Sequence, residues 1–232
     1  MPESTFAAES PAEGHFVQFY LSEAYLAGTV SEFLVEGLKS GEVCIALSTR
    51  EHIEMIEKIL STSFDLDALA AARQWIKVEM DDAESWLCVD GMPTDDALRS
   101  RLEPILAEAA NAGVKTRIFE EIVAVLSEKC MLDESFELEK IWNSIREEYD
   151  FTLFCAYSSD ALRGCDAHDF PEMVSSEHTS VVPDETYTDL DSDGKRLRKR
   201  AFLEMRNAEL RAEIAEFAGR SPKTQRSDEG LV

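Results

Sequence analysis

The sequence predicts an α/β fold with three layers, in which helices flank a mostly parallel sheet and a helical tail follows. Hydrophobic residues make up 44% of the 232-residue chain, enough to fill one core. Strand-like and helix-like segments alternate along residues 15–157, an order that requires crossover connections between parallel strands. Residues 43–47 and 151–157 are continuous apolar runs, as expected of strands covered by helices on both faces.

The first strand and helix are expected within residues 15–41. His15–Tyr20 is typical of a strand, Ser22 can cap the helix that follows, and Gly41 suits its end. The apolar residues on one face of this helix are Leu26, Val30, Phe33, Leu34 and Leu38. This spacing indicates a helix that buries one side.

The later elements continue the alternation. Further strands are expected at residues 75–80 and 115–119. Helical segments are expected at residues 51–60, 66–74, 82–112 with a break at 91–93, and 120–129. A final amphipathic helix carries the stripe Leu138, Ile141, Trp142, Ile145 and Tyr149. We interpret Trp142 as core packing in preference to a ligand contact because it lies on this stripe.

The charge distribution separates a folded region from a tail. Residues 195–226 carry 10 basic and 4 acidic residues, whereas the whole chain has a net charge of −24. A polar stretch rich in Ser, Thr, Asp and Pro precedes this reversal. We expect a flexible N-terminus over residues 1–14, one domain over 15–187, and a linker with a basic helical tail over 188–232.

The tail contains a short heptad pattern. Its seam consists of Leu203, Asn207, Leu210, Ile214 and Phe217. A single seam asparagine fixes the register of a two-stranded coiled coil. Two alternatives stay open, a homodimer through this helix or a helix that packs on its own domain or frays.

Composition argues against several classes of function. An acidic surface repels phosphate backbones and anionic lipids, so we expect no direct binding to nucleic acid or membrane. No apolar run approaches the roughly 20 residues of a membrane span, and the N-terminus lacks the pattern of a signal peptide. Five scattered cysteines without a C-x-x-C pair favour reduced thiols and a cytoplasmic location.

The junction after the first strand lacks a phosphate-binding loop. A nucleotide site there needs glycines that bring backbone N–H groups onto phosphate and a lysine that reaches it. Phe19–Tyr25 contains neither residue type. No nucleophile elbow, zinc-protease motif or dinucleotide fingerprint occurs elsewhere. We therefore expect no ATP hydrolysis, no other enzyme activity and no cofactor.

Two groups of residues are weak candidates for a metal site or for acid–base chemistry. Cys165, His168 and His178 have suitable side chains for zinc, but their spacing is not specific. The pairs Asp81–Asp82 and Glu120–Glu121 follow predicted strands, where carboxylates can hold a cation or transfer a proton. Solvated carboxylates at helix N-termini explain these pairs better, so no metal site is expected.

Short segments in a fixed order carry a family resemblance. They are His15–Tyr20, Phe33–Glu42, Ser48–His52, Asp82–Pro93, Arg117–Val123, Leu138–Asn143, Leu153–Tyr157 and His178–Pro183. Together they resemble the MEDS family of sensory domains. The resemblance implies a RecA/KaiC-like fold without its ATP-binding loop. It also implies a sensor of one-carbon or hydrocarbon derivatives that signals to a kinase or a transcription regulator. Glu120 departs from the family, which usually has a glycine at this turn.

The leading hypothesis is a sensory domain with a small-molecule pocket at the carboxyl ends of the strands. The residues expected to line it are His15, Tyr20, His52, Asp82, Arg117, Glu121 and Tyr157. The histidines would offer donors or a pH-sensitive contact. Arg117 would pair with Glu121, or one of the two would hold a ligand. Purely structural roles for His15 and Arg117 stay open.

Two other hypotheses compete with this one. In the first, the pocket is vestigial and the protein is an interaction module of a signalling pathway. In the second, which ranks lowest, the acidic pairs retain hydrolytic activity.

Overall fold

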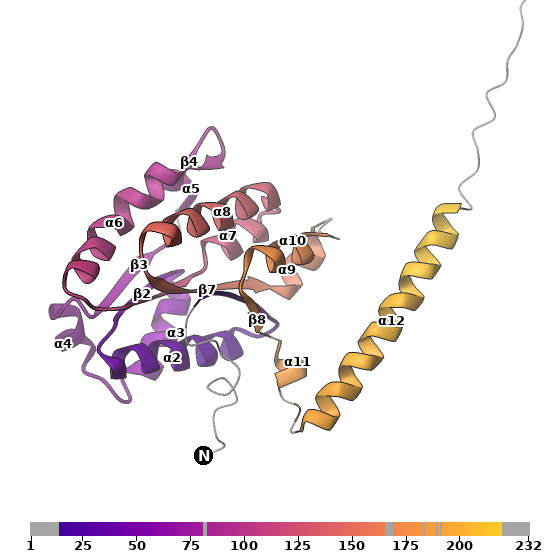
Figure 1. Ribbon diagram of the computed structural model, residues 1–232, viewed down its shortest axis with the longest axis horizontal. Coiled ribbons are helices and arrows are strands. Elements are labelled where there is room, and N and C mark those ends of the chain that lie inside the picture. Colours follow the sequence, from indigo (N-terminus) through magenta and orange to yellow (C-terminus); the bar gives the residue numbers. More distant parts are fainter. Residues whose placement is uncertain are drawn as a thin grey trace, which may run out of the picture. The chain divides into compact units, whose positions relative to one another are not determined.

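The computed structural model describes residues 14–80, 83–165, 169–182, 184–188, 190 and 192–219. The chain divides into two units, residues 1–185 and 186–232. The first unit is a parallel sheet with helices on both faces, which confirms the predicted α/β class (Figure 1). The second contains the long helix α12 (Asp193–Gly219), the predicted helical tail.

The sheet has six strands in the order β3-β2-β6-β7-β1-β8, and every pairing is parallel. The strands are β1 (His15–Tyr20), β2 (Val43–Ser48), β3 (Trp75–Glu79), β6 (Thr116–Glu120), β7 (Phe151–Ser158) and β8 (Ser180–Val182). Because all six run the same way, their carboxyl ends meet at one edge. The three-residue β8 was not predicted as a strand, since so short a segment carries little pattern.

Helices form a layer on each face of the sheet (Figure 1). One layer consists of α2 (Glu23–Ser40), α3 (Arg50–Leu60) and α4 (Leu66–Ala71). The opposite layer includes α6 (Asp95–Asn111), α7 (Ile122–Glu128), α8 (Leu132–Glu148), α9 (Ser159–Gly164) and α10 (Phe170–Glu177). The remaining short elements are α5 (Ala83–Leu87), the hairpin β4 (Cys88–Val89) and β5 (Met92–Pro93), and α11 (Glu185–Thr188). None of the described helices is long and apolar enough to span a membrane.

Successive side chains of each strand point to opposite faces of the sheet, so the sheet divides the hydrophobic core into two halves. Phe16 of β1 and Phe154 of β7 pack edge-on against Phe33 of α2 on one face. Residues such as Leu153 and Trp142 fill the other half, under α8. Trp142 has no exposed surface, in agreement with its predicted role in packing.

The caps predicted for α2 are confirmed. Ser22 Oγ accepts a hydrogen bond from the backbone N–H of Tyr25. Gly41 follows the helix with φ of +78°, and its backbone N–H donates to the carbonyls of Gly37 and Leu38. This left-handed conformation favours glycine over residues with a Cβ atom.

The expectation of five reduced cysteines is wrong for two of them. Cys130 and Cys165 form a disulfide with their Cα atoms 5.6 Å apart. They lie 35 residues apart and follow α7 and α9, two helices that pack together. Cys44, Cys88 and Cys155 form no disulfide among the described residues. The disulfide removes the thiol argument for a cytoplasmic location, which stays a prediction.

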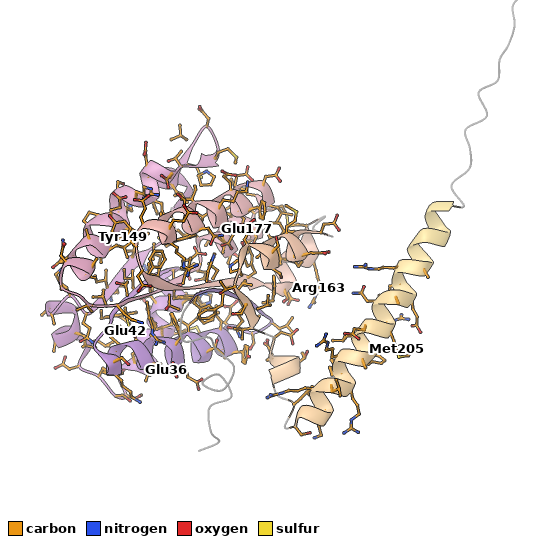
Figure 2. The ribbon with its side chains drawn as sticks, in the orientation of Figure 1. Glu36, Glu42, Tyr149, Arg163, Glu177 and Met205 are labelled. Carbon is orange, nitrogen blue, oxygen red and sulfur yellow. A yellow bond between two sulfur atoms is a disulfide. The ribbon has the colours of Figure 1, made fainter. Side chains whose placement is uncertain are left out.

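Helix α12 exposes several apolar side chains. Leu203 and Leu210, two members of the predicted seam, are 48% and 41% exposed. Phe202 and Met205 are exposed as well, and Figure 2 labels Met205. The side chains of residues 213–219, including the other apolar seam positions, lie outside the described part. The coiled coil stays a prediction.

Candidate functional site

A pocket at the carboxyl edge of the sheet draws residues from three strand–helix junctions. Its volume is about 350 Å³. The lining residues are Glu23, Thr49, Glu51, His52, Glu121, Val125 and Glu128. The junctions follow β1, β2 and β6, and parallel strands bring such junctions to one edge. His52 and Glu121 were both predicted to line a site there.

His52 lies between two carboxylates in this pocket. Its Nδ1 is 2.5 Å from Glu121 Oε1, and its Nε2 contacts the carboxylate of Glu23. Burial alone would lower the pKa of His52, but the hydrogen bonds and negative charges of Glu121 and Glu23 raise it to about 9. His52 is therefore an imidazolium at neutral pH and donates to both carboxylates.

Local structure fixes the positions of these side chains. Ser48 lies at the end of β2, and its hydroxyl donates a hydrogen bond to Glu121 Oε2. Thr49 caps α3 by accepting from the backbone N–H of His52, 3.4 Å away. The cap holds the first turn of α3 at the strand end, which places His52 beside Glu121.

The pocket is strongly acidic. Four of its seven lining residues are glutamates, and no lysine or arginine is among them. Burial, followed by the charges of Glu121 and Glu23, raises the pKa of Glu128. This lining attracts a cation or a hydrogen-bond donor and repels an anion.

Tyr20 lies near this acidic pocket but is 1% exposed. Burial first, and then the charges of Glu121 and Glu23, raise the pKa of its hydroxyl. That hydroxyl has no hydrogen-bond partner among the described residues. A buried donor without an acceptor is costly, so the group is available to a polar molecule that reaches it.

Arg117 lies away from the carboxyl-edge pocket. Its Nε donates to Glu42 Oε2 at 2.5 Å, and its Nη1 donates to the Phe33 carbonyl at 3.1 Å. Nη1 also lies 3.3 Å from Glu36 Oε2, and Figure 2 labels both glutamates. The predicted pair with Glu121 is wrong, because Arg117 pairs with Glu42 and Glu36 whereas Glu121 pairs with His52.

The environment of Arg117 explains why Gly37 lacks a side chain. A Cβ atom on Gly37 would lie 2.8 Å from Arg117 Cδ and 2.8 Å from Cys44 Sγ. The Arg117 side chain therefore packs against α2 at Gly37, where no side chain blocks its path to Glu42. Arg117 thus forms a structural ion pair, but with Glu42 and Glu36 and not with Glu121.

His15 and Tyr157 belong to a buried cluster beneath α8. His15 Nδ1 lies 2.9 Å from Asn143 Oδ1, and the Tyr157 hydroxyl donates to Glu139 Oε1 at 2.7 Å. His15 and Tyr157 have no exposed surface. His15 begins β1, so it is at the opposite end of that strand from the pocket. Asp82 lies outside the described residues.

The seven predicted residues therefore do not form one site. Tyr20, His52 and Glu121 gather at the carboxyl edge, and the others lie elsewhere or are not described. Sequence reasoning missed Glu23 and Glu128 in the pocket. Glu23 was visible only as an ordinary first-turn acid of a helix, a position that usually faces solvent.

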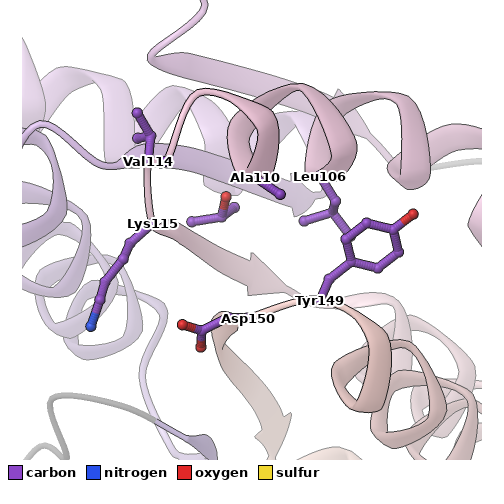
Figure 3. A pocket seen from close by; sticks show the side chains of 8 residues that line it. Leu106, Ala110, Val114, Lys115, Tyr149 and Asp150 are labelled. Carbon is purple, nitrogen blue, oxygen red and sulfur yellow. The ribbon is translucent and has the colours of Figure 1, made fainter.

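A second pocket lies at the amino edge of the sheet (Figure 3). Its volume is about 380 Å³, and Leu106 and Ala110 of α6 form one side. Tyr149 and Asp150 precede β7, and Lys115 precedes β6. The lining of this pocket contains one lysine and one aspartate and no histidine among the described residues. The carboxyl-edge pocket is the stronger candidate.

The chain matches a known family of domains. The family model described as "MEDS: MEthanogen/methylotroph, DcmR Sensory domain" matches residues 14–175. The match includes the strands and helices from β1 to α9 and every residue that lines the carboxyl-edge pocket. No curated protein matches the chain.

Proposed function

Because the chain belongs to the MEDS family of sensory domains, we propose that it senses a small molecule bound in the carboxyl-edge pocket. A sensory, regulatory role follows from the family. The ligand site is our proposal, and it rests on the acidic pocket in which Glu121 and Glu23 hold His52. No step of this role requires catalysis, so the proposal does not include enzyme activity.

The proposed ligand is small and carries a positive charge or several hydrogen-bond donors. The pocket volume of about 350 Å³ accommodates a compact molecule. Glu51 and Glu128 line the pocket without being engaged by His52, so their carboxylates can receive a cationic group. A protonated amine satisfies these requirements better than a carboxylic acid, which the glutamates would repel.

Ligand binding would change the pairing of His52. A cation in the pocket competes with the imidazolium for Glu121 and Glu23. Glu23 belongs to the first turn of α2, so its release alters the contacts that hold this helix end. The sensor would have two states, one in which the glutamates pair with His52 and one in which they pair with the ligand. A ligand shifts the equilibrium between two states only if it binds them differently.

The signal would pass to a kinase or a transcription regulator. A second candidate function, a protein-interaction module, is favoured by the exposed apolar side chains Leu203 and Leu210 on α12. The two functions are compatible if the tail forms the contact with the partner.

A thermal-shift screen of the full chain tests the ligand proposal. Small protonated amines should raise the melting temperature, and carboxylic acids of equal size should not. A ligand at a hundred times its Kd stabilises by about 2.7 kcal/mol, a shift of a few degrees. The gain should disappear in Glu51→Gln and Glu128→Gln, and persist in the matched variant Glu147→Gln, an exposed residue of α8. Equal stabilisation by acids, or no effect of the pocket variants, would contradict the proposal.

A further inference from the structure

The buried cluster beneath α8 contains four potential metal ligands. They are His15 of β1, Glu139 of α8, Cys155 of β7 and His178, the residue after α10. One ligand atom from each lies within 4.8 Å of all the others. We propose that these four side chains bind one divalent transition-metal ion, and that Zn²⁺ fits them best. The proposal is independent of the carboxyl-edge pocket and its ligand.

Four of the six distances between the ligand atoms lie close to those of a tetrahedral site. His15 Nε2 lies 3.1 Å from Cys155 Sγ and 3.3 Å from Glu139 Oε2. Glu139 Oε2 lies 3.6 Å from Cys155 Sγ and 3.4 Å from His178 Nε2. Zinc binds nitrogen and oxygen at about 2.1 Å and sulfur at about 2.3 Å, which separates tetrahedral ligand atoms by about 3.3–3.7 Å. Two histidines, a thiolate and a carboxylate are also ligand types that zinc accepts.

Asn143 orients His15 toward the centre of the cluster. Asn143 Nδ2 donates to the backbone carbonyl and to the carboxylate of Glu177, both at 3.1 Å. Figure 2 labels Glu177. The amide must then present Oδ1 to His15 Nδ1, 2.9 Å away. Nδ1 is therefore the donor in this contact, and Nε2 is the ring nitrogen directed at Cys155 and Glu139. A hydrogen bond on the outer nitrogen is the usual support of a metal-binding histidine.

His178 is oriented in the same way. Its Nδ1 donates to the Val174 carbonyl at 2.7 Å, and its side chain has no exposed surface. Its Nε2 has no hydrogen-bond partner among the described residues and faces Glu139 Oε2. Because Nδ1 donates to the Val174 carbonyl, Nε2 is the ring nitrogen left to bind a metal. A buried polar atom of this kind requires an explanation, and a metal ion supplies one.

The third orienting contact fixes Glu139. Tyr157 donates to Oε1 at 2.7 Å, which leaves Oε2 directed at the two histidines. One ligand atom of each of the four side chains thus faces the same small region.

A divalent ion would balance the charge of the cluster. Metal binding requires the thiolate form of Cys155. On binding, the S–H bond breaks, a sulfur–metal bond forms, and the proton leaves to solvent. Two neutral imidazoles, one thiolate, one carboxylate and a +2 ion then sum to zero charge. Of the weak zinc candidates in the sequence, His178 belongs to this cluster, Cys165 is in the disulfide and His168 lies outside the described residues.

Titration of the full chain with Co²⁺ after removal of metals by a chelator tests the proposal. Cobalt is the probe because a tetrahedral thiolate site gives visible d–d bands and a near-ultraviolet sulfur-to-cobalt band. We expect one equivalent of Co²⁺, both bands, and displacement by one equivalent of Zn²⁺. A chain that retains native circular dichroism but shows no sulfur-to-cobalt band would overturn the proposal.

Matched cysteine variants locate the site. Cys155→Ser should lose the sulfur-to-cobalt band, whereas Cys44→Ser should keep it. Cys44 is also free and fully buried, but it lies in the other half of the core. Asn143→Ala, which keeps all four ligands, should bind Co²⁺ about 10–100-fold more weakly and keep the band. This variant gives an answer if Cys155→Ser does not fold. A band that survives in folded Cys155→Ser, or unchanged affinity in Asn143→Ala, would refute the assignment.

Discussion

His52 Nδ1 lies 2.5 Å from Glu121 Oε1, a contact that joins the first turn of α3 to the junction before α7. The other ring nitrogen of His52 contacts Glu23, which follows β1. Two strands, β6 and β7, lie between β2 and β1 in the sheet. The imidazolium therefore links the junction after β2 to the junction after β1, although these two strands do not pair directly. Its charge state controls that link.

The stability of the protein should depend on pH through His52. The folded-state pKa of about 9 exceeds the ordinary value of 6.5, so the folded protein binds this proton more tightly. The contribution is complete below pH 6.5 and is lost as pH rises through about 9. Allowing for solvent screening at the half-exposed Glu23, we expect a loss of about 1–2 kcal/mol. Urea unfolding across this range measures it.

His52→Gln provides the control for this pH dependence. Glutamine keeps a hydrogen-bond donor but carries no charge, so the decline between pH 6.5 and 9 should disappear from the unfolding free energy. An NMR titration that places the His52 pKa near 6.5 in the wild-type protein would show that the carboxylates do not hold the imidazolium.

The two buried tyrosines should respond oppositely to loss of the hydroxyl. In Tyr20→Phe a hydroxyl without a described partner is removed, so the free energy of unfolding should stay the same or rise by up to about 1 kcal/mol. Tyr157→Phe removes a donor to Glu139 and should cost about 1–3 kcal/mol. Chemical denaturation of both variants measures these changes. Comparable destabilisation in the two variants would mean that Tyr20 has an acceptor.

The sequence predicted the fold well because the fold depends on local patterns. Continuous apolar strands such as 151–157, the cap at Ser22 and the left-handed Gly41 are each encoded within a few residues. The disulfide between Cys130 and Cys165 depends instead on how α7 and α9 pack. Such tertiary proximity leaves no mark on the spacing of the cysteines.

The candidate site was only partly predictable for the same reason. His52 and Glu121 follow strands, and strand ends are where residues of an α/β sheet converge. His15 starts its strand, so the same rule should have placed it at the other edge. Glu139 is an acid adjacent to the apolar stripe of Leu138 and Trp142, a position that can indicate a buried carboxylate. Its burial against His15 and His178 requires the three-dimensional structure.

Opening the disulfide should destabilise the first unit. A cross-link that closes 35 residues restricts the unfolded chain by about 4 kcal/mol in the chain-entropy description. Cys130→Ser with Cys165→Ser should lower the free energy of unfolding by roughly 2–4 kcal/mol. Thiol counting of the denatured, unreduced protein checks the bond itself. Cys44, Cys88 and Cys155 should react, and five reactive thiols would disprove the bond.

Arg117 should support stability and not ligand binding. Arg117→Ala leaves Glu42, whose side chain is 15% exposed, without its 2.5 Å partner. Breaking a largely buried ion pair costs about 3–5 kcal/mol. Arg163→Ala is the matched control, because its pair with Asp160 is exposed and should contribute less than about 1 kcal/mol. An Arg117→Ala protein with wild-type stability, or with selectively lost amine binding, would place Arg117 in the ligand site.

Removal of residues 195–232 should leave the first unit folded and weaken self-association. The two units are separate in their internal contacts, so the sheet does not require the tail. Burial of the exposed seam residues Leu203 and Leu210 in a two-stranded coil would stabilise a dimer. Leu203→Ser with Leu210→Ser should therefore shift the full chain toward monomer in sedimentation experiments. Phe202→Ser with Met205→Ser removes similar exposed apolar area off the seam and should have little effect. A truncated chain that sediments as the same dimer would exclude the coiled coil.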